Sequence, residues 1–517
     1  MIDLKDQNVL ILGLGASGLA MARWCAREGA NVTVTDTRES PPKLDALKAE
    51  VPGAVFVHGN LGQAFSAASA FAHVFKSPGL KPGEVSHLLA MVGSDLPKLK
   101  GELDLFTSAL EMLKTDKAYS PKIVAITGTN GKTTVTSLTG QLVERAGKSV
   151  AVAGNIGPTI LDTLCASLDA GTLPDVWVLE LSSFQLHDVD TFEPTVATVL
   201  NLSQDHLDWH GNMQSYATAK ANVFGATGLM VLNRNDAAVM AMLPEPAPMA
   251  GARDRKAMDR QKLRGAAARE YQTFGGDIPV RPGDFGIEDV NGMSWLVRAQ
   301  EADGARRKRN EEPQELYIQR LMPADALRIR GRHNAVNALT ALALAMACGC
   351  TLATILYGLR EYRGEPHRVE SIGTVNGVEF FDDSKGTNVG ATLAALNGLG
   401  AERRLVVIFG GDGKGQDFSP LAEAVAKFVR TVVLIGRDAS SIREVLASTG
   451  VPLIDAASMQ DAVAKANRAA HAGDAVVMSP ACASFDMFDN YGHRAAVFCD
   501  AVAVLANEAG AVLEGQT

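Results

Sequence analysis

Two glycine-rich turns in this chain have the spacing of phosphate-binding loops. The stronger one, Gly128-Thr129-Asn130-Gly131-Lys132-Thr133-Thr134, directly follows the apolar run 123–126. In such a loop, backbone N–H groups cradle phosphates, the lysine reaches the transferred phosphate, and the first threonine binds Mg²⁺. Ile126 stands where the general pattern has its first glycine, so this loop is a variant of that pattern. The motif predicts hydrolysis or transfer of a nucleoside triphosphate.

A carboxylate suited to holding the metal follows at Glu180, which ends the apolar run 176–179. Burying a carboxylate is costly unless a cation compensates it, and Mg²⁺ prefers oxygen ligands. We therefore predict a Mg²⁺ site formed by Thr133 and Glu180, the alternative being a glutamate that caps a helix. The polar segment 201–210 also follows an apolar run. Asp and His residues clustered at a strand end near a phosphate loop are more often functional than ordinary surface residues, so His206 is a candidate site residue. Lys220, taken alone, indicates only a surface lysine on a helix.

The first glycine turn, Gly13-x-Gly15-x-x-Gly18, is weaker evidence. It follows the apolar run 9–12, opens the helical run 19–27, and is followed by a second apolar run that ends at Asp36. Taken alone, this arrangement favours a nicotinamide or flavin dinucleotide. A UDP-sugar is an alternative ligand, and a turn that only packs a helix on a strand is the alternative without a ligand.

The elements that must position these residues are predicted from three apolar runs, 9–12, 123–126 and 406–409, each followed by glycines or small polar residues. Continuous runs of this length that alternate with helical patterns indicate buried parallel strands, so the fold class is α/β. Polar residues at 116–121 and the glycine at 331 mark the boundaries between three domains. The predicted domains are 1–118, 119–331 and 332–517.

Residues 244–316 are expected to be an insertion in the second domain. The segment contains Pro244, Pro246 and Pro248, and basic clusters at 253–256 and 306–309. We interpret it as a solvated excursion and expect a deletion of residues 250–312 to spare catalysis, the alternative being a docking surface for an acidic partner.

The composition limits the class of protein. The chain has 517 residues, of which 47% are hydrophobic and 21% charged, and its net charge of -9 argues against a nucleic-acid binder. Its six cysteines are scattered without a CxxC pair, which favours a reducing cytosol. The N-terminus has no signal-peptide pattern, and the longest apolar stretch, 339–348, is too short to span a bilayer. We therefore expect a cytoplasmic protein.

Taken together, the motifs resemble those of the Mur ligase family. The segments 127–134, 180–186, 205–208 and 216–220 resemble its central domain, and the segments 331–334, 366–368, 382–388, 410–414 and 479–486 resemble its C-terminal domain. Within the family, the resemblance is greatest to the D-glutamate-adding members, because of the segments 13–18, 36–38, 77–79 and 382–388. Gly386 replaces the alanine that is usual there, a small-for-small change.

The resemblance implies a Rossmann-like N-terminal domain, a P-loop ATPase-like central domain and a Rossmann-like C-terminal domain. It implies that ATP converts the carboxylate of UDP-N-acetylmuramoyl-L-alanine to an acyl phosphate, which D-glutamate attacks, during cytoplasmic synthesis of peptidoglycan precursors. Two Mg²⁺ ions are expected, the second at His206 and a carbamylated Lys220. The two small molecules are the expected partners, with no nucleic acid and no membrane insertion, and the protein is expected to be a monomer.

The resemblance also implies the site residues. The catalytic residues are expected to be Lys132, Glu180, His206 and Lys220, and the metal ligands Thr133, Glu180, His206 and Lys220. The ATP site is expected to comprise Gly128, Thr129, Asn130, Gly131, Lys132, Thr133, Thr134, Asn334, Asn337, Arg368 and Asp383. The UDP substrate is expected at Ala16, Ser17, Asp36, Thr37, Arg38, Ser77 and Asn155. D-Glutamate is expected at His206, Lys385, Thr387, Lys414, Ser484 and Tyr491, the last of which is often Phe in the family.

Three other functions compete with this interpretation. A sister Mur ligase, or a ligase similar to folylpolyglutamate synthase, would use another amino acid. A dinucleotide-dependent oxidoreductase is supported only by the first glycine turn. A non-catalytic nucleotide-binding regulator would lack the second-metal groups His206 and Lys220, and both are present.

Overall fold

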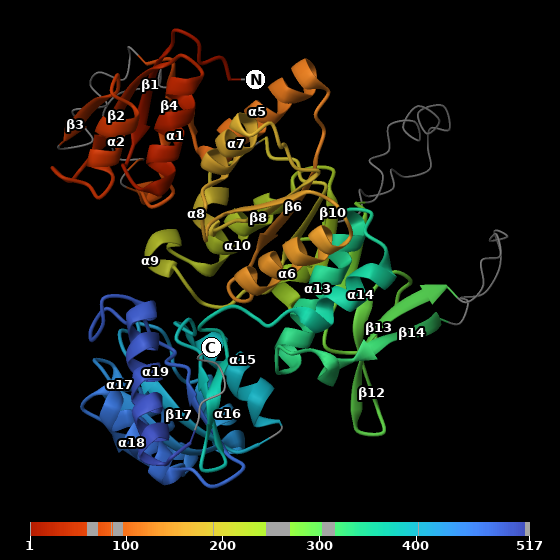
Figure 1. Cartoon of the computed structure of the whole chain (residues 1–517), viewed down its shortest axis with the longest axis vertical. Coiled ribbons are helices and arrows are strands. Elements are labelled where there is room, and N and C mark those ends of the chain that lie inside the picture. The colour runs from red at the N-terminus through yellow and green to blue at the C-terminus, as the bar shows by residue number, and fades with distance from the viewer. Residues whose placement is uncertain are drawn as a thin grey trace, which may run out of the picture. The chain divides into compact units, whose positions relative to one another are not determined.

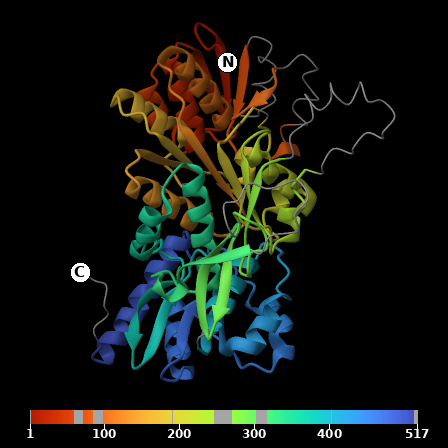
Figure 2. The same ribbon diagram turned by 90° about the vertical axis from the view of Figure 1, so that its right-hand side faces the viewer.

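The computed structural model describes residues 2–58, 71–83, 85, 97–189, 191–244, 269–301, 316–401 and 403–511. The chain forms two compact units, and Figures 1 and 2 show the helices and strands that make them up. Unit 1 comprises Met1–Leu202, His206–Phe274 and Thr340–Gly358. Unit 2 comprises Ser203–Asp205, Gly275–Leu339 and Leu359–Thr517.

Unit 1 begins with a five-stranded parallel sheet in the order β3-β2-β1-β4-β5. Its strands are β1 (Asn8–Leu12), β2 (Asn31–Asp36), β3 (Val55–His58), β4 (His73–Lys76) and β5 (Leu99–Lys100). The helices are α1 (Ala16–Arg27), α2 (Leu44–Glu50) and α5 (Glu102–Lys117). Because β1 has a neighbour on each side, its side chains from Val9 to Leu12 are fully buried. This burial explains the continuous apolar run. Helix α1 packs against β1 and β2, beside which Figure 1 shows it, and α2 packs against α1.

The second sheet of unit 1 has six parallel strands in the order β11-β10-β9-β6-β8-β7. They are β6 (Lys122–Thr127), β7 (Val150–Gly154), β8 (Val176–Glu180), β9 (Val196–Val199), β10 (Leu229–Asn233) and β11 (Tyr271–Phe274). The helices between them are α6 (Lys132–Arg145), α7 (Ile160–Asp169), α8 (Ser183–Leu186), α9 (Leu207–His210), α10 (Met213–Ala221), η2 (Asn222–Phe224) and α11 (Ala237–Met240). The helices α13 (Arg332–Ala347) and α14 (Leu352–Glu361) follow later in the chain.

Helix α7 connects the two sheets of unit 1. It packs against α1 and α5, and Phe106 of α5 meets Trp177 of β8 edge-on at 5.0 Å between ring centroids. Arg23 also forms an ion pair with Asp162 at 2.8 Å. These contacts explain why the sheets that bear the two predicted glycine turns fall within one compact unit.

Unit 2 contains a three-stranded antiparallel sheet, which is drawn in green in Figure 2. Its strands are β12 (Phe285–Val290), β13 (Met293–Glu301) and β14 (Leu316–Pro323), followed by η3 (Ala324–Ala326). Asn291 and Gly292 join β12 to β13 with φ values of 51° and 80°, the left-handed conformation that a two-residue hairpin turn requires. Phe285, Ile287 and Leu296 are buried.

These strands correct the interpretation of residues 244–316 as one solvated excursion. Among the described residues of that segment, 271–274 form a strand of the second sheet and 285–301 form most of a hairpin. The expected tolerance of a deletion of residues 250–312 is therefore wrong in its premise, because the deletion would remove β11, β12 and β13. Residues 245–268 and 302–315, including both basic clusters, lie outside the described residues.

The C-terminal sheet of unit 2 has the order β15-β16-β20-β17-β18-β19 and is parallel except for the β15–β16 pair. Its strands are β15 (Glu370–Val375), β16 (Val378–Asp382), β17 (Leu405–Gly410), β18 (Val429–Ile435), β19 (Leu453–Asp455) and β20 (Ala475–Met478). Its helices are α15 (Val389–Gly400), α16 (Leu421–Phe428), α17 (Ala439–Leu446), η4 (Ala447–Thr449), α18 (Met459–Ala469) and α19 (Tyr491–Glu508). Val407 contributes to one apolar core of this sheet and Val406 to the other, as alternation along a strand requires.

Three predominantly parallel sheets with intervening helices confirm the predicted α/β class. The apolar runs 9–12, 123–126 and 406–409 lie within β1, β6 and β17, as predicted. The domain limits at 118 and 331 stay predictions.

Candidate functional site

The first glycine turn contributes to a pocket of about 380 Å³ in unit 1. The pocket is lined by Gly13, Leu14, Gly15, Ala16, Ser17, Asp36, Thr37, Arg38, Ser77, Pro78, Gly79 and Leu80. Of the seven residues predicted for the UDP substrate, only Asn155 is not in its lining. The turn is tight because a Cβ at position 18 would lie 2.0 Å from the carbonyl oxygen of Gly13, so only glycine fits there.

Asp36 fixes the shape of this pocket. Its Oδ2 accepts hydrogen bonds from the backbone N–H of Leu14 and from Nη2 of Arg38, both at 2.8 Å. Its Oδ1 accepts from the backbone N–H of Arg38 at 2.9 Å and from Nε of Arg38 at 2.8 Å. The hydrogen bonds from Arg38 lower the pKa of Asp36 to about 2. Two donors therefore occupy each carboxylate oxygen, which leaves Arg38, whose side chain is 55% exposed, as the group free to meet a ligand.

The second glycine turn joins β6 to α6. Thr133 and Thr134 lie in the first turn of the helix and are buried. The Lys132 ammonium donates to the carbonyl oxygens of Gly128 and Thr129 at 2.9 and 2.8 Å. This arrangement places a cation and a helix N-terminus at one loop, as binding of a phosphate requires.

Glu180 ends β8, the neighbour of β6 in the sheet. Its side chain is 1% exposed, and Oε1 accepts a hydrogen bond from Nδ2 of Asn155 at 2.9 Å. The other oxygen, Oε2, is buried and has no hydrogen-bond partner among the described residues. A buried carboxylate oxygen without a donor is costly unless a cation compensates it. Glu180 therefore fits a Mg²⁺ ligand, and its buried position at a strand end does not fit a helix cap.

Lys220 lies in α10 and is 2% exposed, so the interpretation of it as a surface lysine is wrong. Its ammonium donates to the carbonyl oxygen of Gly128 at 2.9 Å and to Oγ1 of Thr127 at 3.2 Å. It also lies 4.7 Å from the ring centroid of Tyr216. The side chain therefore reaches the beginning of the phosphate loop, a position that its helical spacing alone does not reveal.

His206 directly precedes α9 in a left-handed backbone conformation, with φ of 53°. Its ring packs edge-on against Phe184 at 4.8 Å, and Trp209 contacts the same phenyl ring at 4.8 Å. His210 stacks on that ring as well, and its Nε2 lies 2.9 Å from Oγ of Ser183. Burial lowers the pKa of His210 to about 4, so this imidazole is neutral at pH 7.

In unit 2, the predicted adenosine residues occupy two places. Asn334 and Asn337 lie in α13 and are hydrogen-bonded to each other at 3.1 Å. Asp383 follows β16 and accepts a hydrogen bond from Oγ of Ser479 at 2.6 Å. Burial raises the pKa of Asp383 to about 7, although the nearby charge of Arg368 opposes this effect. The roles of all four predicted residues stay predictions.

Five of the six residues predicted for D-glutamate lie in unit 2, four on loops and Tyr491 at the start of α19. The Lys385 ammonium lies over the ring of Tyr491, 3.7 Å from its centroid. The loop of Lys414 pairs with the segment before Ser484 through an isolated bridge from Asp412 to Ala483. The fifth residue, Thr387, donates its backbone N–H to the carbonyl oxygen of Lys385 at 2.8 Å, and the sixth, His206, belongs to unit 1.

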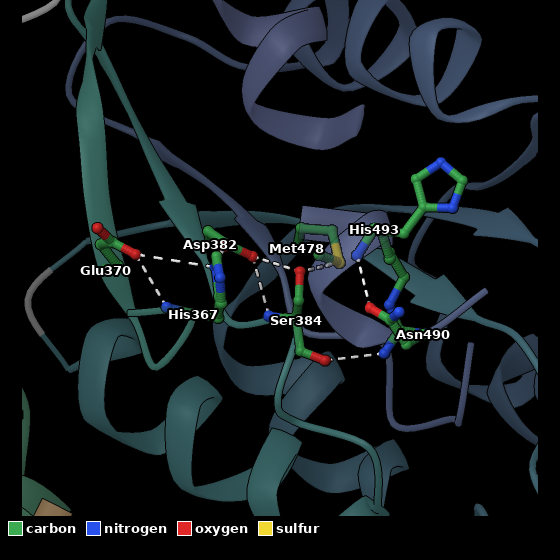
Figure 3. Close-up of polar contacts among 8 residues, drawn as sticks. His367, Glu370, Asp382, Ser384, Met478, Asn490 and His493 are labelled. Carbon is green, nitrogen blue, oxygen red and sulfur yellow. Dashed lines mark hydrogen bonds and ion pairs between the residues drawn. The ribbon is translucent and has the colours of Figure 1, made fainter. Parts of the chain in front are cut away.

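Figure 3 shows a polar network beneath these loops. His367 Nδ1 lies 2.7 Å from Oδ2 of the fully buried Asp382, and the backbone N–H of Ser384 donates to Oδ1 of the same carboxylate at 2.9 Å. Glu370 accepts a hydrogen bond from the backbone N–H of His367 at 2.8 Å. The side chains of His367, Glu370 and Asp382 lie close enough to share a metal ion. However, His367 Nδ1 and Asp382 Oδ2, two of the atoms that would bind it, are already hydrogen-bonded to each other. We therefore assign the network to positioning of the Ser384 loop.

A buried arginine next to this network supports two of the same loops. Arg494 of α19 donates to the carbonyl oxygen of Ser384 at 2.8 Å and to that of Cys482 at 3.1 Å. The prediction from sequence did not include it. Its position on a long helix gives no motif signal, so only its contacts reveal the role.

Sequence reasoning also left Asn201 out of the predicted phosphate site. Its Oδ1 accepts a hydrogen bond from the backbone N–H of Asn130 at 2.9 Å, and its Nδ2 donates to the carbonyl oxygen of Asn130 at 3.0 Å. The Asn201 side chain therefore pairs with both the backbone N–H and the backbone carbonyl of Asn130, as a neighbouring strand would, and holds the phosphate loop in place. Its position just after β9, the other neighbour of β6, is a signal that could have identified it.

Three family models match this chain. They are the Mur ligase MurD-like, N-terminal domain over residues 7–91, the Mur ligase middle domain over 126–274, and the Mur ligase, glutamate ligase domain over 367–482. Each match covers one of the sheets that carry the predicted site residues. The chain belongs to the Mur ligase family, and the resemblance drawn from the motifs is confirmed.

Two similar proteins carry the same name, that of one member of the family. The UDP-N-acetylmuramoylalanine–D-glutamate ligase of Albidiferax ferrireducens is 63% identical over 515 residues, which cover 100% of this chain and 99% of the relative. The protein of the same name from Ralstonia nicotianae is 53% identical over 522 residues, with 99% of each chain covered.

Solved structures agree on the fold. The MurF ligase from Thermotoga maritima in complex with ADP aligns with a TM-score of 0.53 at 15% identity, covering 98% of this chain and 100% of that chain. MurF from Acinetobacter baumannii also gives 0.53, at 18% identity, covering 81% and 87%. In the part of the chain that the structure describes, no helix combines the length and the apolar character that crossing a bilayer requires.

Proposed function

We propose that this chain is an ATP-dependent ligase that joins D-glutamate to UDP-N-acetylmuramoyl-L-alanine in the synthesis of peptidoglycan precursors. Relatives that carry the name of this ligase match the whole chain at 53% and 63% identity. The structural observation that carries the proposal is the buried Oε2 of Glu180 on the strand next to the phosphate loop, for which the described part of the chain offers no hydrogen-bond partner. A carboxylate in that position suits an enzyme that transfers phosphate, because it needs a metal cation to be stable.

Amide formation from a free carboxylate is unfavourable because the group that must leave, hydroxide, is a poor leaving group. ATP overcomes this by donating its γ-phosphoryl group to the alanyl carboxylate, which gives an acyl phosphate and ADP. The D-glutamate amine then attacks the acyl carbon, and the resulting tetrahedral intermediate expels inorganic phosphate. The amine loses a proton as the new C–N bond forms.

Phosphoryl transfer depends mainly on positioning and neutralisation of charge. Lys132 would leave its loop carbonyls for the β- and γ-phosphates, and the backbone N–H groups of the loop would hold the phosphates in place. Thr133 and Glu180 would hold a Mg²⁺ ion, which supplies positive charge to the phosphate oxygens. Asn155, bonded to Glu180, would fix the orientation of that carboxylate.

We propose a second Mg²⁺ at His206 and a carbamylated Lys220. An ammonium cannot bind a metal, whereas a carbamate presents two hard oxygens. To form it, neutral Lys220 Nζ attacks CO₂, a C–N bond forms and the nitrogen releases a proton. Burial beside the phosphate loop supports this role, since a surface lysine would not reach the phosphates.

The UDP substrate is proposed to occupy the pocket of about 380 Å³, with Arg38 as the exposed contact. The roles of Lys385 and Lys414 follow from charge, because an acidic amino acid needs fixed cations beside its carboxylates. The packing of Lys385 on Tyr491 would hold one of these cations in place. All six cysteines are free thiols, which supports a cytoplasmic enzyme, and we propose that it acts as a monomer.

The experiment is phosphate release from ATP and UDP-N-acetylmuramoyl-L-alanine with one amino acid at a time. D-Glutamate, L-alanine, L-lysine and meso-diaminopimelate separate this ligase from its sister enzymes. The proposal predicts release with D-glutamate only. Release with another amino acid instead would assign the chain to a sister activity, and a change in NADH absorbance without phosphate release would support the oxidoreductase.

A further inference from the structure

Two lysines flank the segment that forms one wall of the substrate pocket. Lys76 ends β4, and the segment Ser77-Pro78-Gly79-Leu80 that follows it lines the pocket. The next residue, Lys81, lies 3.4 Å from Oδ2 of Asp208. Lys76 lies 2.7 Å from Oδ2 of Asp188. Both acids belong to the segment of the second sheet that carries α8 and α9, so the pocket wall is attached to that segment at both ends.

Lys76 makes the stronger of the two attachments. Its side chain is 6% exposed, whereas that of Lys81 is 45% exposed. Lys76 and Asp188 form an ion pair rather than an aligned hydrogen bond, and the ammonium also lies 5.5 Å from the ring centroid of Trp209. Burial raises the pKa of Asp188, but the hydrogen bond from His187 and the ion pair with Lys76 outweigh burial and lower it to about 2. A buried ammonium is strongly destabilising when its partner is removed, so this contact is specific.

The attachment leads directly to His206. Trp209, whose ring lies 5.5 Å from the Lys76 ammonium, packs against Phe184, and His206 packs against the same phenyl ring. Trp209 and His206 are also joined through the backbone, since the N–H of Trp209 donates to the carbonyl oxygen of His206 at 3.1 Å. These contacts form a continuous path from the pocket wall through Lys76 and Trp209 to the imidazole.

We propose that the segment 76–81 couples binding of the UDP substrate to the position of His206, and that Lys76 is the positioning residue of this coupling. The inference rests on the proposed substrate pocket and on the proposed metal-binding role of His206. It adds that the first site changes the affinity of the second. By linkage, ATP and Mg²⁺ must then tighten binding of the UDP substrate by the same factor as the UDP substrate tightens theirs.

The experiment measures binding of a non-hydrolysable ATP analogue with Mg²⁺, with and without UDP-N-acetylmuramoyl-L-alanine. In the wild type, we expect the UDP substrate to tighten analogue binding roughly tenfold, within the usual range of coupling between sites. Lys76→Met keeps the apolar stem over Trp209 and leaves Asp188 partly solvated. We expect it to bring the coupling factor close to 1 while each ligand alone binds within about threefold of the wild type.

Three further variants make the test specific. Lys76→Arg keeps a cation opposite Asp188 and should retain most of the coupling, which would trace the loss in Lys76→Met to the missing charge. Asp188→Asn removes the other partner at a half-exposed position and should lose coupling as Lys76→Met does, so it decides the question if Lys76→Met does not fold. Lys48→Met, an exposed lysine on α2, is the matched control and should couple as the wild type does.

Two results would overturn the inference. Wild-type coupling that persists in folded Lys76→Met or in Asp188→Asn would show that the ion pair is only structural. A wild type that binds both ligands without any coupling, yet ligates D-glutamate, would refute the inference and leave the proposed function intact. A wild type that does not bind the UDP substrate at all would refute both.

Discussion

Replacement of Asp36 by asparagine tests the architecture of the substrate pocket. The carboxylate accepts four hydrogen bonds, one from Leu14 and three from Arg38. An amide keeps one acceptor oxygen but places an N–H₂ group where the second oxygen receives donors. Either the buried N–H of Leu14 or the guanidinium of Arg38 therefore loses its partner.

The size of the effect follows from the pKa of Asp36. Lowering that pKa from 3.8 to about 2 corresponds to roughly 2–3 kcal/mol of stabilisation of the charged form. Arg38 is 55% exposed, so solvent screening reduces the part that appears as stability, and we expect Asp36→Asn to lower the free energy of unfolding by about 2 kcal/mol. The Kd for the UDP substrate should rise by up to about 30-fold, which is the change that a loss of the same ~2 kcal/mol from the binding free energy produces.

Denaturant unfolding at several pH values and calorimetric titration with the UDP substrate measure both effects. A carboxylate with a lowered pKa stabilises the fold above its unfolded pKa near 4, and this stabilisation is lost as the pH falls toward 2. The difference between the wild type and Asp36→Asn should therefore be full at pH 6 and shrink toward pH 3. Glu39→Gln, which removes an exposed charge three residues away, is the control and should change neither quantity. Equal stability and equal Kd for Asp36→Asn and the wild type at pH 6 would refute the reasoning.

Substitutions at three further positions probe the phosphate loop and the C-terminal site. Lys132→Ala should lower kcat by roughly 10²–10³, as loss of one preorganised charge does, with no change in the Kd for the UDP substrate; a near-normal kcat would remove the loop from the mechanism. Lys220→Ala should be inactive and partly recovered by acetate, which supplies a hard oxygen, whereas Lys220→Arg should stay inactive because a guanidinium neither reacts with CO₂ nor binds metal. An active Lys220→Arg enzyme in steady-state assays would contradict the carbamate. Burial raises the pKa of Asp383 to about 7, so the wild type should lose up to about 4 kcal/mol of stability relative to Asp383→Asn between pH 4 and pH 7, and parallel unfolding curves across that range would contradict this.

Features set by short, local patterns could be predicted from the sequence. The segments 13–18, 36–38 and 77–79, through their resemblance to the family, identified six of the residues that line the pocket. The apolar strand ending at Glu180 predicted a buried carboxylate beside the phosphate loop, and the structure contains one. In both cases, the residues lie at the ends of parallel strands, where the chain order and the sheet order determine the neighbourhood.

Features that depend on contacts between distant segments could not be predicted. Lys220 has the spacing of a surface lysine, yet its ammonium is buried because α10 packs behind the phosphate loop. No sequence motif predicts the contacts of Lys76 and Arg494. Lys76 meets Asp188 and Arg494 meets the Ser384 carbonyl, each more than a hundred residues away.

One error had a local signal that was not used. The polar and proline-rich flanks of 244–316 suggested a single solvated segment, but Asn291-Gly292 between two apolar runs is a strong hairpin signal. The pair Asn376-Gly377 joins β15 to β16 in the same way, with φ values of 51° and 78°. An Asn-Gly pair between two apolar runs is therefore better evidence for the local structure of a segment than the average polarity of its flanks.

The most direct test of the central claim follows one oxygen atom. If ATP activates the alanyl carboxylate as an acyl phosphate, expulsion of phosphate transfers one carboxylate oxygen to phosphorus. UDP-N-acetylmuramoyl-L-alanine labelled with ¹⁸O in that carboxylate should give, with ATP and D-glutamate, one labelled oxygen in each inorganic phosphate released and one in the new amide. Mass spectrometry of both products measures this. Unlabelled phosphate released in step with the D-glutamyl amide would contradict the account.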